Sequence, residues 1–314
     1  MNVLSLFDGI SCGMVALERA GIPVEKYSAY EIDKYAITVS EKNYPYIERH
    51  GDVFYGNFKK YKGCDLLIGG SPCTYWSVAK KGRETTPDGE GFRLFMQYIR
   101  ALEESRSKYF LYENNNSIHE TIKAEISKFL GVEPIMIDSA LVSAQQRKRC
   151  YWTNIPNVIQ PEDKEIYLKD IIVSGILWQN KSYAYTTRCQ AATFKDTLER
   201  HRHTIFVFNN LVAEPVRIGQ IGKGGLGERI YSVYGKSVSM KANGGGGGAK
   251  TGLYKIDLPD GDYIIRKLYP IEAERLQTLP DNYTEGISNT QRYKCIGNGW
   301  TVDVIAHILG FISK

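Results

Sequence analysis

The sequence lacks any apolar run near the roughly 18 residues that a membrane-spanning helix requires. Its first seven residues lack a basic segment and a long apolar segment, so we expect no secretion signal and a cytoplasmic protein. There is no Cys-x-x-Cys and no paired Cys/His spacing among the six cysteines, which argues against a disulfide framework and a zinc site. The cysteines are Cys12, Cys64, Cys73, Cys150, Cys189 and Cys295.

The chain has little excess charge overall, but the charge is unevenly distributed. The net charge of the 314 residues is +5, while positions 181 to 255 hold 12 Lys/Arg against 4 Asp/Glu, a local charge of +8. The remainder therefore carries −3. A basic segment on a nearly neutral body indicates a surface for a polyanion, although a solvated loop region with spare lysines is an alternative.

The first 150 residues alternate between short apolar runs and amphipathic runs. This pattern predicts a mostly parallel, doubly wound sheet with helices on both faces. The expected strands are 3–7, 27–32, 65–68, 109–112 and 134–137. The expected helices are 14–20, 34–43, 93–104 and 122–130.

Helical periodicity fades after Pro156 and returns from Lys267, with helices expected over 271–276 and 302–311. The sequence therefore predicts one domain formed by 1–156 plus 266–314 and a smaller, irregular, β-rich domain at 157–265. Within the latter, Gly244 to Thr251 nearly matches a phosphate-binding P-loop, but Ala249 replaces the second required glycine. We therefore interpret this stretch as a flexible loop that lets Lys250 and backbone amides approach a phosphate or a groove.

Two reactive side chains follow apolar runs. Ser71-Pro72-Cys73 comes directly after the run 65–70, and Glu113 follows the run 109–112. Ligands of open α/β sheets bind outside the carboxyl ends of the strands. A thiol and a carboxyl group at neighbouring strand ends can attack a ring carbon and protonate the ring.

Several motifs, in order, resemble the cytosine-C5 DNA methyltransferases, above all the catalytic domain of the animal de novo enzymes and their bacterial and phage relatives. The motifs are Leu6-Phe7-Asp8-Gly9-Ile10, Gly70-Ser71-Pro72-Cys73, Arg93-Leu94-Phe95, Met136-Ile137-Asp138 and Val142-Ser143-Ala144. The resemblance spans nearly the whole chain and is weakest at about 157–265. It implies a Rossmann-like S-adenosylmethionine-dependent methyltransferase fold with a small target-recognition domain.

The resemblance also implies S-adenosyl-L-methionine as the cofactor. Glu31 would accept from the ribose hydroxyls and Asp52 from the adenine amino group. Gly297-Asn298-Gly299-Trp300 resembles a late loop of the family that returns to the cofactor, with Asn298 and Trp300 near the methionine end. The implied cofactor-binding residues are Phe7, Asp8, Gly9, Glu31, Ile32, Asp52, Val53, Pro72, Leu94, Asn298 and Trp300.

By the same resemblance, Cys73 would attack C6 of cytosine, and Glu113 would hold and protonate N3. Gln145-x-Arg147-x-Arg149 is similar to a strand of the family in which both arginines share a face and reach cytosine O2, the glutamate or the surroundings of the cysteine. Two departures stand out: Thr74 where the family often has Gln, and Asn115 where Val is common.

The partner implied is double-stranded DNA, bound by a monomer that flips the target base out of the duplex. The segment 74–91 resembles the mobile loop that closes over that base. Its implied DNA contacts are Ser77, Lys80, Lys81 and Arg83. In the smaller domain the candidates are Arg202, Arg217, Lys223, Arg229, Lys241 and Lys250.

Two other functions remain open at this point: a tRNA cytosine methyltransferase, since one branch of the family acts on RNA, and a catalytically inactive DNA-binding relative. The presence of Cys73, Glu113 and both arginines argues against the second. The target sequence and the existence of a restriction partner are not encoded in any recognisable motif.

Overall fold

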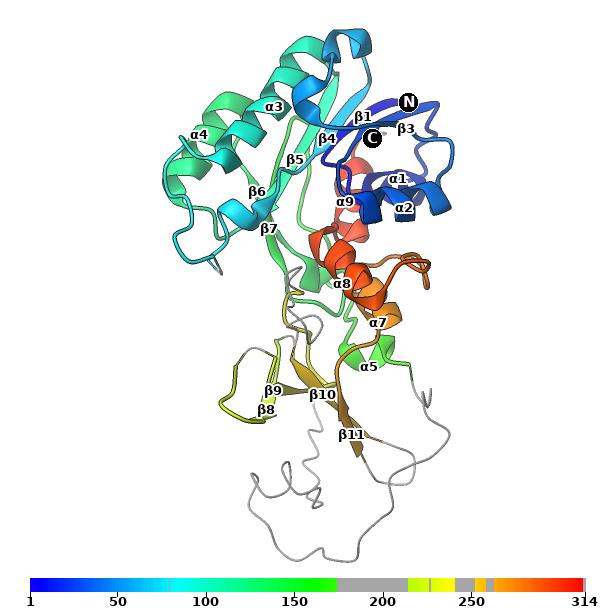
Figure 1. Ribbon diagram of the computed structural model, residues 1–314, viewed down its shortest axis with the longest axis vertical. Helices are drawn as coiled ribbons and strands as arrows, with labels where there is room; N and C mark the ends of the chain where they lie inside the picture. Colours follow the sequence, from blue (N-terminus) through cyan, green and yellow to red (C-terminus); the bar gives the residue numbers. More distant parts are fainter. Residues whose placement is uncertain (79, 174–213, 226, 241–251, 258–262, 313–314) are drawn as a thin grey trace, which may run out of the picture.

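The computed structural model describes residues 1–78, 80–173, 214–225, 227–240, 252–257 and 263–312. A mostly parallel sheet of seven strands forms its centre, in the order β3-β2-β1-β4-β5-β7-β6 (Figure 1). The strands are β1 (Asn2–Leu6), β2 (Lys26–Tyr30), β3 (Glu48–His50), β4 (Leu66–Gly69), β5 (Tyr109–Asn115), β6 (Ile135–Asp138) and β7 (Lys148–Thr153). Strand β7 runs antiparallel to both of its neighbours, β5 and β6, whereas the other pairings are parallel.

Helices cover both faces of this sheet, as the alternating pattern predicts (Figure 1). Helices α1 (Cys12–Arg19), α2 (Lys34–Asn43) and α9 (Val302–Leu309) share one hydrophobic cluster with Val3 and Ile68, whose side chains point to that face. Helices α3 (Glu90–Ser105) and α4 (Glu120–Leu130) share the other cluster with Leu4 and Leu67. Neighbouring residues of each strand thus enter opposite layers, because side chains alternate across a sheet.

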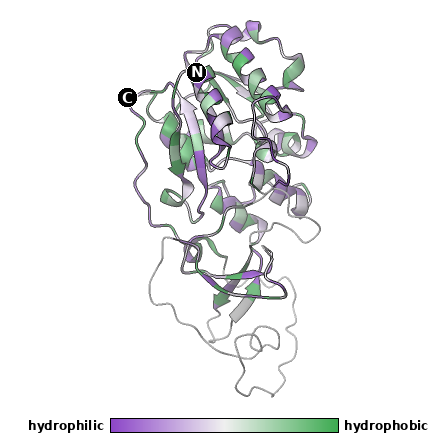
Figure 2. Ribbon diagram, turned by 90° about the vertical axis from the view of Figure 1, so that its left-hand side faces the viewer, coloured by the Kyte–Doolittle hydropathy of each residue, from purple (hydrophilic) through white to green (hydrophobic). Residues whose placement is uncertain are grey.

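The helices of both layers are amphipathic, and in Figure 2 hydrophobic and hydrophilic residues alternate along them. Helix α2 has the bounds predicted from the sequence and begins at an Asp33 side chain that accepts from the backbone N–H groups of Tyr35 and Ala36. This cap satisfies donors that the first helical turn leaves free. Within the described residues, no helix combines the length and the apolar character needed to cross a bilayer.

A second, smaller sheet has the order β11-β10-β9-β8 and lies beyond α7 and α8 in Figure 1. Its strands are β8 (Arg217–Gln220), β9 (Arg229–Ser232), β10 (Leu253–Asp257) and β11 (Tyr263–Arg266). The nearby helices are α5 (Leu168–Ile171), α7 (Pro270–Leu276) and α8 (Asn289–Asn298). Tyr231 and Tyr254 of the small sheet share a hydrophobic cluster with Leu276 of α7 and Ile296 of α8. The small sheet is therefore packed on the helices that return to the main body.

A buried lysine also joins the two parts. Lys236, 1% exposed, follows β9 and donates to the backbone carbonyl oxygens of Ala140 at 2.9 Å, Ser143 at 3.3 Å and Ile166. Burial lowers the pKa of its ammonium group, while nearby carboxylates act in the opposite direction. Three carbonyl acceptors offset much of the cost of burying a charge.

Two local predictions are corrected by these bounds. Gly297 and Asn298, expected in a loop, form the last turn of α8, and Gly299 is its C-cap. Strand β7 begins at Lys148, one residue after Arg147, so Arg149 lies in the strand and Arg147 precedes it.

Candidate active site

A cavity of about 280 Å³ lies at the carboxyl ends of the parallel strands. Its walls are the turns after β1, β2 and β4, the end of β5, the start of β7 and the end of α8. Because the carboxyl ends of parallel strands meet at one edge of a sheet, segments distant in sequence converge there. Of the residues predicted from the sequence, the cavity brings together Phe7, Asp8, Gly9, Glu31, Ile32, Pro72, Cys73, Glu113, Arg147, Arg149, Asn298 and Trp300.

The turn after β4 presents Cys73 to this cavity. Cys73 is partly exposed and begins the short 3-10 helix η3 (Cys73–Tyr75). Two hydrogen bonds from β5 stabilise this turn. Asn114 Nδ2 donates to the backbone carbonyl of Ser71 at 3.0 Å, and the hydroxyls of Ser71 and Tyr112 lie 2.6 Å apart. These buried bonds tie the turn to β5, the strand that carries Glu113.

Glu113 is buried, with both carboxylate oxygens engaged. Arg149 Nε lies 3.1 Å from Oε1, and the indole nitrogen of Trp300 donates to Oε2 at 3.0 Å. The carboxylate therefore has one charged and one neutral donor that fix its orientation. A Cβ atom at Gly70 would lie 2.8 Å from the Glu113 carbonyl oxygen and 3.1 Å from Oε2, so glycine is required for this close approach.

Arg147 lines the same cavity, but it binds main-chain carbonyl oxygens, whereas Arg149 pairs with Glu113. The guanidinium of Arg147 donates to the carbonyl oxygens of Gly297 at 3.2 Å, Gly299 at 3.1 Å and Met240 at 3.3 Å. Burial, together with the nearby charge of Arg149, lowers its pKa to about 10. Arg147 therefore remains charged near neutral pH and fastens the end of α8 beside the cavity.

The opposite part of the cavity is formed by the turns after β1 and β2. The backbone N–H groups of Gly9, Ile32 and Asp33 donate to the Glu31 carboxylate at 2.8, 2.7 and 2.8 Å. Burial raises the pKa of Glu31, and these three N–H groups oppose that rise. A Cβ built on Gly9, whose φ is +60°, would meet no atom within 4 Å, so the cavity is open at this point.

Asp8 lies beneath the same turn and accepts from three hydroxyl groups. They belong to Ser5 at 2.6 Å, Ser11 at 2.5 Å and Tyr27 at 2.7 Å. Burial raises the pKa of Asp8, and the Ser11 hydroxyl is the strongest of the opposing contributions. Asp8 therefore shapes the turn through its side chain as well as lining the cavity.

Asp33 and Lys294 also line the cavity, although they were not among the site residues predicted from the sequence. Lys294 Nζ of α8 donates to Asp33 Oδ2 at 2.6 Å and connects α8 to the start of α2. Asp33 is recognisable as a helix N-cap in the sequence. No local signal marks Lys294, because its partner lies 261 positions away.

Three predicted cofactor-binding residues lie outside this cavity. The Asp52 carboxylate accepts from the backbone N–H of Phe54 at 2.9 Å and caps the 3-10 helix η1 (Val53–Tyr55). Val53 is 5% exposed and belongs to the core cluster of α3 and α4. Leu94 is half-buried on α3.

The predicted DNA contacts of the segment 74–91 follow η3. Lys80 lies over the ring of Tyr75, with Nζ 4.7 Å from its centre, and Lys81 is exposed. Ser77 donates its backbone N–H to the carbonyl of Cys73 at 3.0 Å. Arg83 donates to the backbone carbonyl of Ser117 and is half-buried.

In the small sheet, the side chain of Arg217 contacts Gln220, and Arg229 donates to the carbonyl of Gly224 at 3.3 Å. Lys223 is exposed in the turn between β8 and β9. Arg202, Lys241 and Lys250 lie outside the described residues.

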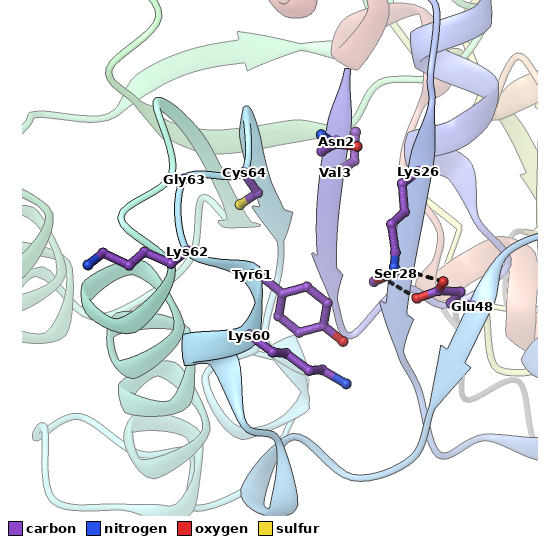
Figure 3. A pocket seen from close by; sticks show the side chains of 10 residues that line it. All are labelled: Asn2, Val3, Lys26, Ser28, Glu48, Lys60, Tyr61, Lys62, Gly63 and Cys64. Atoms are coloured by element: carbon purple, nitrogen blue, oxygen red, sulfur yellow. Dashed lines mark hydrogen bonds and ion pairs between the residues drawn. The ribbon is translucent and has the colours of Figure 1, made fainter.

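A second cavity, of about 370 Å³, lies at the amino ends of β1, β2 and β4 (Figure 3). Its carboxylate, Glu48, is engaged by Lys26 Nζ at 2.9 Å and by the hydroxyl of Ser28 at 3.1 Å. Its thiol, Cys64, is buried, and burial raises its pKa. This cavity holds no pair of accessible thiol and acid, and no cluster of metal-ligating side chains occurs in the part of the chain that the structure describes.

Comparisons with known proteins agree with the motifs at the first cavity. The family model for C-5 cytosine-specific DNA methylases matches residues 1–314. The chain belongs to this family. Its members are S-adenosylmethionine-dependent enzymes that methylate cytosine in DNA. The chain is 29% identical over 331 residues to the type II methyltransferase M.HhaI of Haemophilus parahaemolyticus, covering 98% of the chain and 93% of that protein.

A phage methyltransferase is similar as well. The orphan methyltransferase M.SPRI of Bacillus phage SPR is 26% identical over 427 residues, which cover 98% of the chain and 96% of that protein. Among solved structures, EhMeth of Entamoeba histolytica has a TM-score of 0.71 at 17% identity, covering 99% of this chain and 97% of that chain. A putative DNA modification methyltransferase encoded in an Escherichia coli prophage has a TM-score of 0.65 at 20% identity, covering 100% and 98%. These structures confirm the predicted methyltransferase fold.

Proposed function

We propose that the chain is a sequence-specific DNA (cytosine-5)-methyltransferase in which Cys73 is the nucleophile and Glu113 the acid. The observation that carries this proposal is that both side chains line one cavity, whose other wall holds the Glu31 carboxylate. Cys73 and Glu113 can therefore act on the same small ring, while Glu31 is available to the cofactor on the other side of the cavity.

In the proposed reaction, the Cys73 sulfur forms a bond to C6 of cytosine, and Glu113 transfers a proton to N3. The π electron pair of the C5=C6 bond becomes available at C5, which then takes up the methyl group. Loss of the C5 proton to water, cleavage of the C6–sulfur bond and return of the N3 proton to Glu113 restore the aromatic ring and release Cys73 as the thiolate. Arg149 keeps the Glu113 carboxylate directed into the cavity.

The residues of the opposite wall suit S-adenosylmethionine, which supplies an electrophilic methyl group when bound. One oxygen lone pair of Glu31 remains for a ribose hydroxyl, since Oε1 accepts two backbone N–H groups and Oε2 accepts one. The open space at Gly9 leaves room for the cofactor backbone. We also propose contacts from Phe7, Ile32, Pro72 and Trp300, which line the same cavity.

Carbon atoms C5 and C6 of a cytosine are covered by stacking in duplex DNA, so the base has to leave the stack, at a cost of roughly a few kcal/mol. We propose that segment 74–91 and the basic segment 181–255 hold the DNA while this occurs. Exposed Lys81 and Lys223 are suited to phosphate contacts. The proposal describes a cytoplasmic monomer acting on duplex DNA, with or without a restriction partner.

The test is transfer of labelled methyl groups from S-adenosylmethionine to duplex DNA, with tRNA as a parallel substrate. Cys73→Ser is expected to abolish transfer while cofactor binding, measured by calorimetry, stays within about twofold of wild type. Cys64→Ser, at the second cavity, is the matched control and should retain activity. Transfer by Cys73→Ser at the wild-type rate would refute the mechanism, and transfer to tRNA alone would refute the assigned substrate.

A further inference from the structure

A chain of polar contacts connects segment 74–91 to the nucleophile through the end of β5. Asn115, 6% exposed, directs its side-chain amide to the backbone carbonyl of Cys73 at 3.4 Å. Its Oδ1 accepts from the hydroxyl of Ser117 at 2.7 Å. A buried carboxamide with partners on both sides has a defined orientation.

The other end of this connection is Arg83. Its guanidinium donates to the backbone carbonyl oxygens of Ser117 and, at 3.4 Å, of Trp76. Arg83 and Asn115 therefore hold the same residue, Ser117, one through its carbonyl group and the other through its hydroxyl.

The segment around Arg83 is itself anchored. Trp76 is fully buried, and its indole nitrogen donates to Glu84 Oε2 at 3.0 Å. The same oxygen accepts from the backbone N–H of Gly91 at 3.1 Å, at the start of α3. Arg83 thus reaches Ser117 when the segment is folded around the Trp76–Glu84 pair.

Segment 74–91 and Asn115 both donate to one atom, the backbone carbonyl oxygen of Cys73. The carbonyl oxygen of Cys73 accepts from the backbone N–H groups of Trp76 at 3.2 Å and Ser77 at 3.0 Å, in addition to the Asn115 amide. We propose that Asn115 is a positioning residue that couples the folded state of segment 74–91 to the orientation of Cys73. This inference rests on the proposed function, because it assigns the coupling to the nucleophile of that reaction.

Removal of the Asn115 amide is expected to lower kcat more than it weakens the binding of S-adenosylmethionine. A neutral hydrogen bond contributes about 1 kcal/mol, so removal of the Asn115 amide should lower kcat roughly fivefold. Misplaced reacting atoms slow the chemical step, whereas cofactor affinity depends on the opposite wall of the cavity. The KM for S-adenosylmethionine should therefore change less than about twofold.

The first test follows amide hydrogen exchange in the peptide that contains residues 73–78, using the whole chain without DNA. Asn115→Val and Arg83→Ala should each accelerate exchange at Trp76 and Ser77 several-fold, and the double variant should add little. Asn154→Ala is the matched control: Asn154 accepts from Phe110 N–H at 2.8 Å and donates to the Lys108 carbonyl at 3.0 Å, at the other end of β5. Unchanged exchange in Asn115→Val, or equal acceleration in Asn154→Ala, would overturn the coupling.

The second test measures kcat and the KM for S-adenosylmethionine from steady-state methyl transfer by the same variants. A roughly fivefold loss of kcat in each single variant, with no further loss in the double variant, supports the coupling. Losses that multiply in the double variant overturn it. A wild-type chain without methyl transfer would refute the proposed function, while the exchange test of the Arg83–Ser117–Asn115 connection would still decide the structural link.

Discussion

The indole nitrogen of Trp300 lies 3.0 Å from Oε2 of Glu113. Trp300 follows α8, whose last carbonyl groups are bound by Arg147. Trp300 therefore lines the cavity and also orients the Glu113 carboxylate. Trp300, selected from the sequence as a cofactor contact, thus also touches the proposed acid. This relationship can be separated experimentally from cofactor binding.

Trp300→Phe keeps an aromatic ring but removes the N–H donor. We expect kcat to fall by roughly tenfold, because hydrogen bonds to charged groups contribute about 1.5–3 kcal/mol. The measurement is kcat from steady-state methyl transfer, with cofactor affinity measured separately by calorimetry.

The control for this substitution is Trp152→Phe. Trp152 donates to the hydroxyl of Ser127 at 3.0 Å in the core cluster of α3 and α4, away from the cavity. The Trp152→Phe variant should have a lower free energy of unfolding than wild type but the same kcat. Normal kcat with weakened cofactor binding in Trp300→Phe would show that Trp300 acts on the cofactor alone.

Glu31→Gln tests the cofactor wall. The amide NH₂ of glutamine would face backbone N–H groups that now donate to a carboxylate oxygen, so at least one of three bonds is lost. We expect the Kd for S-adenosylmethionine to rise by roughly tenfold, measured by calorimetry. Glu41→Gln, at an exposed position of α2, should bind as wild type does. Equal affinity in both variants would remove Glu31 from the cofactor site.

Lys294→Met tests the link between α8 and α2 through its dependence on pH. Burial raises the pKa of Asp33, but the Lys294 hydrogen bond and backbone donors outweigh it and lower the pKa below 3.8. The hydrogen bond to Asp33 raises the pKa of Lys294 above 10.5, against the effect of burial. The Asp33 contribution to stability is present above pH 3.8 and is lost as pH falls through its folded-state pKa. The Lys294 contribution is present below pH 10.5 and is lost as pH rises.

The free energy of unfolding of Lys294→Met should therefore lie about 1 kcal/mol below wild type near neutral pH, and the difference should shrink at acid pH. Urea denaturation at several pH values measures this difference. Lys128→Met, which removes an exposed pair with Glu125, is the control and should change stability little. A difference that grows as the pH falls below 3.8 would contradict the assignment.

The central fold was accessible from the sequence because most strands and helices of the first 150 residues carry their own periodicity. Helix α2 has the predicted bounds, and β1, β2, β4 and β5 lie within one to three residues of prediction. Strand β3 was missed, because three polar or charged residues, Glu48 to His50, give no apolar run.

Helix α8 shows where local signals are insufficient. Its sequence is polar and its last two residues are Gly297 and Asn298, a pair that is typical of a loop. Gln277 donates to the Ile296 carbonyl at 2.9 Å, and Arg147 donates to that of Gly297 at 3.2 Å, so distant side chains stabilise its last turn. For the same reason the sequence did not reveal that Arg147 binds main-chain carbonyl groups, although it placed Arg147 at the correct cavity.

The reversed direction of β7 changes where a functional residue can be sought. In β1, β2 and β4 the chain arrives at the active edge, so cavity residues come after the strand. In β7 the chain departs from that edge, so Arg147 lies just before the strand and Arg149 is its second residue. If only the residues that follow each apolar run are considered, Arg147 and Arg149 are missed. The direction of each strand therefore has to be inferred before site residues are assigned to its ends.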